Sequence, residues 1–291
     1  VAMFPQLIAG PIVRYRDIAP QLKERTHSLE AAASGTSRFA VGLGKKVLVA
    51  NVLAQLVSAY KASAEQTALY AWLYAIAFTL QIYFDFSGYS DMAIGLGRIF
   101  GFTFPENFRY PYIAKSITEF WRRWHMSLGS WFRDYVYIPL GGNRCSRARN
   151  VWNLFVVWFL TGMWHGASWN FIAWGLWFFV LLVGEKLLWG KALERLPSLV
   201  RHAYAMVLVV FSWVLFRAET LTAAAAYLAA MFGSSGVWCG SRVVYYALEF
   251  WPELLCCCIA ALPVKQWLET ALQKRDAAPA RAVLTWGPKL A

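Results

Sequence analysis

A single histidine inside a long apolar run is the residue of this chain best suited to chemistry. His165 lies within Thr161–Asn170, and no Asp, Glu, Lys or Arg occurs between Val151 and Val183. An ionisable group at membrane depth is costly and is usually kept for function. Imidazole has an unperturbed pKa of about 6.5, so it can accept and return a proton near neutrality. We therefore predict that His165 is a catalytic base, a role that typically contributes about 10²- to 10⁴-fold in rate.

The alternative for His165 is a structural role, in which the helix backbone or the nearby Ser168 or Asn170 satisfies the imidazole. Leucine could replace a buried polar group of purely structural role at lower cost, which favours a catalytic role for His165. Ser168 and Asn170 are then predicted to be supporting residues of the site. His125 is a second catalytic candidate. It lies on an Arg-rich amphipathic segment, where an interfacial histidine is also ordinary.

Two carboxylates and three arginines complete the set of candidate site residues. Asp85 and Asp91 could orient a histidine, as the third member of a catalytic triad does, or they could pair with Arg98 or cap a kinked helix. Arginines bind phosphate through paired hydrogen bonds. The candidates for the phosphates of coenzyme A or of a lipid carrier are Arg122, Arg123 and Arg133. The competing interpretation of these arginines is that they enforce membrane topology.

The composition predicts that these residues are held by helices in a membrane. Hydrophobic residues make up 59% of the 291 residues, charged residues only 15%, and the mean hydropathy is +0.42. Soluble domains carry about 25% charged residues. The 16 Trp and 14 Tyr suit the two headgroup interfaces. We predict an all-α, multi-span integral membrane bundle with broken or re-entrant and interfacial helices.

The basic residues also follow a membrane pattern. The net charge is +12, but Lys and Arg fall in short loops between apolar segments, which indicates membrane topology and lipid contact rather than nucleic-acid binding. Residues 105–150 carry eight basic and three acidic side chains, so we place them on the cytoplasmic side. Within them, Ser116 and Glu119 form a capping box, with Thr118 as an alternative cap. The helix that follows carries an apolar stripe to Phe132.

The N-terminal segments are predicted from charge and length. Residues 1–37 form a polar loop on the cytoplasmic side, and the helix at 38–60 contains Lys45 and Lys46, which favour an interfacial or re-entrant helix over a span. Residues 67–84 form a span, followed to residue 104 by a kinked or buried polar helix. Gly97 and Gly101 are spaced for close helix packing there.

The later segments repeat the pattern. Residues 151–188 form either two short spans that meet at a turn or broken helices that line a cavity, and both place His165 inside the bundle. Further spans are predicted at 203–217 and 244–263. The Ala-rich residues 220–232 form an interfacial helix, and 264–291 form a polar C-terminal tail.

Several other chemistries lack their sequence signals. The five cysteines show neither zinc-site nor disulfide spacing, so we predict apolar packing and no metal site. The segment at Gly42–Lys46 lacks the glycine spacing of a phosphate-binding loop, and Gly95 and Gly97 are not followed by the third glycine of a dinucleotide motif. Met92 stands where a serine-hydrolase elbow needs glycine.

Six motifs, in this order, resemble the membrane-bound O-acyltransferase (MBOAT) family, in its bacterial branch for alginate O-acetylation. The resemblance covers residues 1 to about 232. The motifs are Phe4–Ile12 (FPQLIAGPI), Asp85–Ala93 (DFSGYSDMA), Pro105–Phe108 (PENF), Phe120–Ser127 (FWRRWHMS), Trp164–Ala167 (WHGA) and Phe211–Arg217 (FSWVLFR).

The resemblance implies a helical fold that encloses a funnel or tunnel, through which an acyl group from a cytoplasmic donor reaches an acceptor on the other side. His165 matches the family's near-invariant histidine, and His125 matches a second important one. Acyl transfer from a thioester to a hydroxyl needs a base for that hydroxyl, which suits His165. A covalent acyl-imidazole role is less favoured.

The resemblance also implies the surroundings of the reaction. The acyl donor is expected to be acetyl-coenzyme A, with no permanently bound cofactor. The expected partners are an exported polysaccharide such as alginate, periplasmic acetyltransferase proteins and membrane lipid, with the chain in the bacterial inner membrane. Residues 1–291 are expected to be a single domain, the C-terminal part of a longer protein.

Three alternatives remain. Within the family, the acceptor could be another wall polymer, either peptidoglycan or teichoic acid. A membrane transporter would also use broken helices and an intramembrane histidine, although it would more often show symmetric repeats and paired charges. A purely structural scaffold for an export complex would leave His165 without a purpose.

Overall fold

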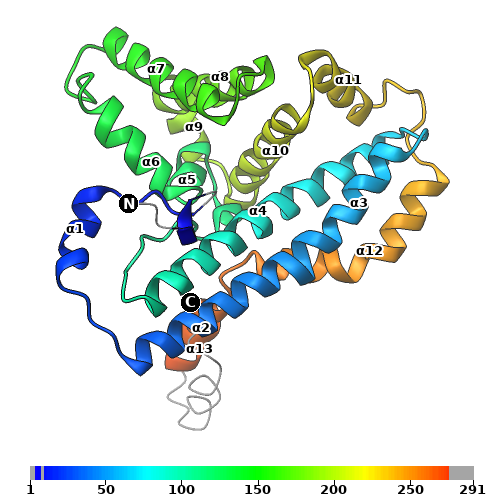
Figure 1. The fold of residues 1–291 in the computed structure, drawn as a ribbon. Coiled ribbons are helices and arrows are strands. Elements are labelled where there is room, and N and C mark those ends of the chain that lie inside the picture. The colour runs from blue at the N-terminus through cyan, green and yellow to red at the C-terminus, as the bar shows by residue number, and fades with distance from the viewer. Residues whose placement is uncertain (1–3, 8–9, 275–291) are drawn as a thin grey trace. The chain divides into compact units, whose positions relative to one another are not determined.

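The computed structural model of the chain describes residues 4–7 and 10–274, and within these residues it contains helices and no strand (Figure 1). The helices form two compact units. Unit 1 comprises the described parts of Val1–Leu53, Leu80–Tyr110 and Pro252–Ala291, and unit 2 comprises Ala54–Thr79 and Pro111–Trp251.

Thirteen α-helices are connected by short turns, 3₁₀ turns and π-helical segments in the described chain. The α-helices are α1 (Tyr15–Lys23), α2 (Leu29–Gly44), α3 (Asn51–Ala62), α4 (Ala68–Ile99), α5 (Ile117–Trp121), α6 (Met126–Phe132), α7 (Arg147–His165), α8 (Trp169–Gly184), α9 (Gly190–Glu194), α10 (Ser198–Arg217), α11 (Leu221–Met231), α12 (Ser241–Ala260) and α13 (Val264–Lys274). The 3₁₀ turns are η1 (Phe4–Gln6) and η3 (Pro111–Ile113), and the π-helical segments are η2 (Lys45–Ala50), η4 (Arg133–Tyr137) and η5 (Glu185–Trp189).

Five helical stretches are long and apolar enough to cross a membrane, which confirms the predicted multi-span helical fold. They are Leu29–Ala62, Ala68–Ile99, Trp169–Glu194, Ser198–Arg217 and Ser241–Ala260. A helix needs about 20 residues to cross the hydrocarbon core, because each residue advances it by about 1.5 Å. The chain is therefore a multi-pass membrane protein.

The prediction of an interfacial or re-entrant helix at 38–60 was wrong. Helices α2 and α3 join through the π-helical segment η2 into one helical stretch of 34 residues. The two lysines that argued against a span are paired within unit 1. Lys45 Nζ lies 2.6 Å from Asp91 Oδ2, and Lys46 pairs with Asp85. A charge whose partner lies on a neighbouring helix is far cheaper at membrane depth than an isolated one.

Helices α2 and α4 meet closely through glycines in unit 1. A Cβ atom at Gly42 would lie 2.5 Å from the carbonyl oxygen of Gly88, and one at Gly95 would lie 2.5 Å from that of Gly35. These four glycines let the two backbones touch. The predicted pair Gly97 and Gly101 does not form this contact, because Gly97 packs on Phe104 and Gly101 has a φ of 76° beyond the end of α4.

Helix α4 differs from its prediction as well. The expected boundary after residue 84 is absent, and one helix of 32 residues runs from Ala68 to Ile99. The predicted buried polar character of its second half is confirmed at Ser87 and Ser90, each only 2% exposed, whereas the Asp85 side chain is 44% exposed. Ser90 Oγ accepts a hydrogen bond of 3.1 Å from Asn107, which offsets the cost of its burial.

The N-terminal residues are more ordered than the predicted polar loop at 1–37. Helix α1 and the start of α2 lie within this range. The side chain of Ile18 joins an apolar cluster with Ile94, Phe102 and Phe104, which anchors α1 in unit 1. Ser28 caps α2, because its hydroxyl accepts a 3.0 Å hydrogen bond from the backbone N–H of Ala31.

The predictions for the C-terminal half hold in large part. Helices α7 and α8 meet at a turn, as one of the two alternatives for 151–188 stated, but only the stretch that begins with α8 is apolar enough to be a span among the described helices there. Helices α10 and α12 match the spans expected at 203–217 and 244–263. Helix α11 is a short apolar helix, too short to span. The predicted tail begins with α13, a helix through Lys274, and residues 275–291 lie outside the described residues.

Candidate functional site

His165 is the last residue of α7, at the turn into α8. The α7–α8 hairpin is tight in unit 2 (Figure 1), because a Cβ atom at Gly175 would lie 2.3 Å from the carbonyl oxygen of Trp158 and 3.2 Å from Gly162 Cα. Gly166 ends α7 with a φ of 157°. The sequence thus places His165 at the end of an apolar helix, where its ring lies along the last turn.

One ring nitrogen of His165 is committed to the backbone. Nδ1 lies 2.7 Å from the carbonyl oxygen of Thr161, one turn earlier in α7. A carbonyl oxygen only accepts hydrogen bonds, so Nδ1 carries the proton and donates it. The other nitrogen of neutral imidazole, Nε2, therefore holds a free lone pair. A backbone carbonyl is a common partner that fixes the tautomer of a functional histidine.

Aromatic rings surround the half-buried His165. The centroid of its ring lies 4.8 Å from that of Trp164, 4.7 Å from that of Trp174 and 5.4 Å from that of Phe216, all at steep angles. Trp174 is 1% exposed. These three residues belong to α7, α8 and α10 of unit 2, and we call them the aromatic wall of His165. Apolar surroundings disfavour a charged imidazole and favour the neutral form that can act as a base.

His125 lies beside the same aromatic wall. It is 3% exposed, and its ring centroid is 6.0 Å from that of Trp164, whose indole also contacts His165. Trp164 therefore joins the two histidines. Burial, and secondarily the nearby His165, lower the pKa of His125 from 6.5 to about 3, so this imidazole is neutral at physiological pH.

The backbone of His125 is unusual. With φ 45° and ψ 52° it adopts the left-handed conformation at the start of α6. Few residues other than glycine do so, and such strained residues gather at functional sites. The predicted single helix to Phe132 is accordingly divided at His125 into α5 and α6. Most of the apolar stripe is buried inside unit 2, where Trp124 is 3% exposed, but Trp131 is 37% exposed.

Helix α5, which precedes His125, is anchored at its first turn. Ser116 caps it as predicted, with a 3.0 Å hydrogen bond from the N–H of Glu119. Thr118 is not the cap. The buried carboxylate of Glu185, at the end of α8, accepts hydrogen bonds of 2.6 Å from the N–H of Ile117 and 2.8 Å from that of Thr118. A carboxylate at a helix N-terminus also complements the helix dipole.

Ser168 and Asn170 do not hydrogen-bond His165 in the structure. The hydroxyl of Ser168 donates to the side-chain oxygen of Asn170, and the Asn170 amide donates 2.6 Å to the carbonyl oxygen of Ala218. They tie the α7–α8 turn to the end of α10. Their contribution is to hold the turn that carries His165.

Asp85 and Asp91 form ion pairs with lysine and arginine side chains; neither bonds a histidine, and neither pairs with Arg98. Both lie in unit 1. Asp91 accepts hydrogen bonds of 2.8 Å from Arg38 and 2.6 Å from Lys45, and Asp85 accepts one from Lys46. Arg98 donates to Ser34 instead, at 3.1 Å. The group that orients His165 is the Thr161 carbonyl.

The three predicted phosphate-binding arginines have different surroundings. Arg123 donates two hydrogen bonds, 3.0 Å and 2.8 Å, to Glu119, and Arg133 donates one of 2.7 Å to Asp134. The Asp134 partner raises the pKa of Arg133. Burial raises the pKa of Glu119, but hydrogen bonds from the Lys115 N–H and from Arg123 outweigh it and leave the pKa lowered. Arg122 is exposed.

Three basic residues, Lys186, Arg147 and Arg149, lie at one end of the α7–α8 hairpin, which we call its basic end. Lys186, just past α8, donates 2.7 Å to Asn143 and 2.6 Å to Asn150, and Asn150 belongs to the first turn of α7. The start of α7, with the exposed Arg147 and Arg149, thus meets the far end of α8. His165 is at the opposite end of α7, about 27 Å from Arg147 by the helical rise.

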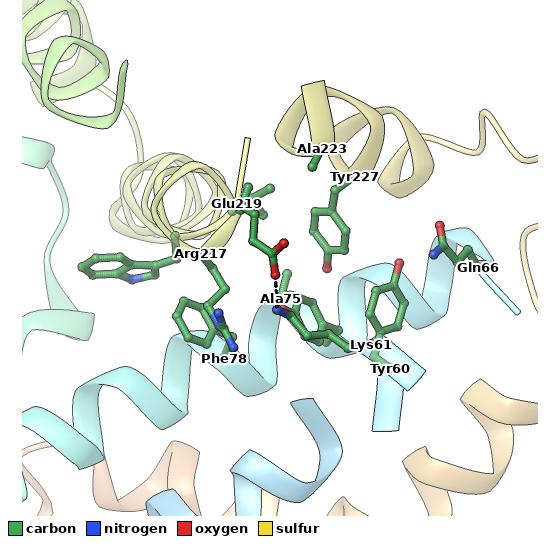
Figure 2. Close-up of a pocket in the computed structure, with 13 residues that line it drawn as sticks. Tyr60, Lys61, Gln66, Ala75, Phe78, Arg217, Glu219, Ala223 and Tyr227 are labelled. Atoms are coloured by element: carbon green, nitrogen blue, oxygen red, sulfur yellow. Dashed lines mark ion pairs between the residues drawn. The ribbon is translucent and has the colours of Figure 1, made fainter. Parts of the chain in front are cut away.

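A cavity of about 480 Å³ lies near that opposite end, between α3, the start of α4, the end of α10 and α11, all in unit 2 (Figure 2). Its lining is aromatic and cationic. Arg217 stands 5.7 Å over the ring of Phe78, and Lys61 lies 3.6 Å from Glu219. Trp213 shares this wall, and its ring is 5.7 Å from that of Phe216, which contacts His165.

Three of these features were not predicted from the sequence. Glu185 had no predicted role, although it is the first charged residue after the apolar run. Arg217 was only the last residue of a motif, and no sequence pattern marks the Tyr60 side of the cavity. Among the described residues, no cluster of three His, Cys, Asp or Glu side chains could hold a metal ion.

Comparison with known proteins identifies the class. Residues 1–226 match the model of the membrane-bound O-acyltransferase family (MBOAT). The chain belongs to this family, so the resemblance of the six motifs is confirmed.

Individual relatives narrow this class. The chain is 51% identical over 238 residues to a probable alginate O-acetylase, AlgI, of Azotobacter vinelandii, covering 82% of this chain and 48% of that protein. The Pseudomonas aeruginosa AlgI is 50% identical over 238 residues, covering 82% and 46%. A peptidoglycan O-acetyltransferase of Helicobacter pylori is 38% identical over 245 residues, covering 81% and 46%. The chain spans about half the length of the curated relatives it matches.

Proposed function

We propose that this chain is the acyl-transferring part of a bacterial inner-membrane O-acetyltransferase that serves an exported polysaccharide such as alginate. The observation that carries the proposal is the 2.7 Å hydrogen bond from His165 Nδ1 to the Thr161 carbonyl oxygen, which leaves Nε2 free as a base. Identity of 51% to a probable alginate O-acetylase supports the choice of acceptor.

In the proposed reaction, His165 Nε2 removes the proton from an acceptor hydroxyl. The hydroxyl oxygen attacks the thioester carbonyl of acetyl-coenzyme A, a C–O bond forms, the C–S bond breaks, and the thiolate takes the proton from the imidazolium. The buried ring of Trp174 and the ring of Phe216 shelter one side of the imidazole from water, which would otherwise compete with the acceptor. His125, neutral and beside Trp164, lines the same space and assists there.

The donor is proposed to enter from the basic end of the hairpin. Arg122 is exposed and Arg133 is largely exposed, so both are accessible to the phosphates of coenzyme A, with Arg123 next to Arg122 in the chain. Periplasmic acetyltransferase proteins would then complete the delivery of the acetyl group to the polymer on the exported side.

The experiment is His165→Ala in the full-length protein, with polymer acetylation measured alongside protein abundance. We expect acetylation to fall by at least about 10²-fold at unchanged abundance. Ser168→Ala is the matched control, since Ser168 belongs to the same turn without touching the imidazole. Undiminished acetylation by a normally abundant His165→Ala protein would remove the proposed base.

Peptidoglycan is the second candidate acceptor, favoured by the 38% identity to the peptidoglycan O-acetyltransferase. Both polymers are proposed to receive the acetyl group through the periplasmic acetyltransferase proteins, so His165 has the same role in either case. Expression in a host that lacks its own alginate and peptidoglycan O-acetylases, followed by acetate release from each purified polymer, separates the two acceptors.

A further inference from the structure

We propose that the cavity between α3, α4, α10 and α11 binds the headgroup of an anionic phospholipid, with Arg217 as the residue that binds the lipid phosphate. This inference goes beyond the proposed function and does not depend on it. It assigns a ligand class to a cavity that neither of the two histidines lines.

Arg217 carries a charge that no carboxylate neutralises in the described part of the chain. The residue is half-buried, and its guanidinium stands 5.7 Å over the ring of Phe78. By contrast, Arg38 and Lys45, in a span of unit 1, both pair with Asp91. A half-buried cation without such a partner is costly, and a bound anion would offset that cost.

The lining of the cavity as a whole is cationic. Glu219, the one carboxylate among the lining residues, lies 3.6 Å from Lys61, and its side chain is 85% exposed (Figure 2). The two cations and this carboxylate leave a net charge of +1, which belongs to Arg217. An arginine held on an aromatic face presents a planar fork of donors that matches a phosphate.

The cavity lies at the ends of membrane spans, which is the level of lipid headgroups. The end of α3, the start of α4 and the end of α10 all contribute to its lining, and each of them ends a span. The Arg-rich start of α7 marks the cytoplasmic end of the α7–α8 hairpin by the positive-inside rule. Asn170, at the other end of the hairpin, is bonded to Ala218, which lines the cavity. The cavity therefore belongs to the exported leaflet.

The walls of the cavity favour a lipid over a free anion. The rings of Tyr60 and Tyr74 stack with centroids 4.6 Å apart, and Tyr227 meets both edge to face. Leu69, in the first turn of α4, is 47% exposed, and Leu221, in that of α11, is 44% exposed. Aromatic rings are enriched at headgroup level, and basic pockets between membrane helices bind anionic headgroups. The volume of about 480 Å³ falls in the range of small-ligand sites, about 300–1,000 Å³.

The test measures lipid binding to the full-length protein in a neutral detergent, by native mass spectrometry and by melting temperature. The probes are phosphatidylglycerol, phosphatidylcholine with the same acyl chains, inorganic phosphate and a tetra-aspartate peptide. We expect phosphatidylglycerol to bind at least about 10-fold more tightly than the other three. It should also raise the melting temperature, because a ligand that binds only the folded state stabilises that state.

Arg217→Gln should weaken the binding of phosphatidylglycerol roughly 10- to 100-fold, and Arg217→Lys should weaken it less, since lysine keeps the charge without the fork. Arg195→Gln, at an exposed arginine just past α9, is the matched control for general attraction between anionic lipid and basic side chains. It should bind phosphatidylglycerol as the parent protein does.

Ala223→Trp is the second variant, because it leaves Arg217 in place. Ala223 is exposed and lines the cavity, so the larger side chain should fill the cavity and abolish the preference for phosphatidylglycerol. Equal binding of phosphatidylcholine, of phosphate or of the peptide would overturn the proposal. So would an equal loss in Arg195→Gln, or full affinity for phosphatidylglycerol in Arg217→Gln or in Ala223→Trp.

Discussion

The imidazole of His165 donates from Nδ1 to the carbonyl oxygen of Thr161 over 2.7 Å, and the two residues are one helical turn apart in α7. The bond uses a second lone pair of a helix carbonyl oxygen, an acceptor that every helix provides one turn before a given residue. This hydrogen bond holds the imidazole in one tautomer, so no carboxylate is needed for that purpose. The imidazole ring contacts the indole of Trp164, which also contacts His125.

Trp164 is expected to matter for activity and little for stability. Its indole touches both histidine rings, yet the residue is 55% exposed. Trp164→Ala should lower acetylation on the order of 10-fold, because misplacement of a catalytic group by an ångström is costly. Acetylation and abundance are measured together. Trp169→Ala, at a tryptophan that is 72% exposed beyond the same turn, is the control and should behave as the parent protein; equal loss in both variants would argue for a general effect on the turn.

His125 should make the stability of the protein depend on pH. Its folded pKa of about 3 lies below the ordinary 6.5, so between these values the unfolded chain binds a proton that the folded chain does not. The free energy of unfolding is therefore highest above pH 6.5 and falls by about 1.4 kcal/mol per pH unit below it, about 2 kcal/mol by pH 5.

The measurement is the apparent melting temperature in detergent between pH 7 and pH 5. His125→Asn should lose less stability over this interval than the parent, and asparagine tolerates the left-handed backbone at this position. His27→Asn, at an exposed histidine, controls for the loss of a histidine elsewhere. Parallel curves for His125→Asn and the parent protein would contradict the assignment of His125 as buried and neutral.

The main features of the site could be predicted from the sequence because they depend on local composition. A run without charges reveals the one ionisable group inside it, and the Ser116–Glu119 spacing fixes the start of α5. The Thr161 bond also follows from local geometry, since residues four apart share a helix face. The family match over residues 1–226 agrees with motifs that sequence order alone brings out.

Contacts between distant segments could not be predicted in this way. Lys45 and Lys46 argue against a span only while their partners are unknown, and Asp91 lies more than forty residues away in the chain. The break at His125 is equally hidden, because an apolar stripe with helical spacing continues across it and only the backbone angle shows the change. Tertiary pairing overrides local propensity in both cases.

Glu185 is expected to stabilise the segment that carries His125. Its buried carboxylate accepts bonds from the first N–H groups of α5, and an amide in its place would turn a donor toward those donors. Glu185→Gln should cost about 2 kcal/mol of stability and lower acetylation. Melting temperature and acetylation are compared with those of Glu194→Gln, at an exposed glutamate of α9. A Glu185→Gln protein as stable as Glu194→Gln would show that the cap is dispensable.

The glycine contact between α2 and α4 predicts that alanine substitutions at two nearby glycines change the stability of the protein in opposite directions. A Cβ atom at Gly42 would meet the Gly88 carbonyl oxygen at 2.5 Å, whereas one at Gly44 would meet nothing within 4 Å. Gly42→Ala should therefore destabilise the protein by about 1–3 kcal/mol, since two backbones must separate. Gly44→Ala, in an ordinary helical conformation, should stabilise it by about 0.5–1 kcal/mol by restricting the unfolded chain. Thermal unfolding in the same detergent compares the two variants directly, and a Gly42→Ala protein as stable as Gly44→Ala would mean that α2 and α4 are not held in backbone contact in the membrane.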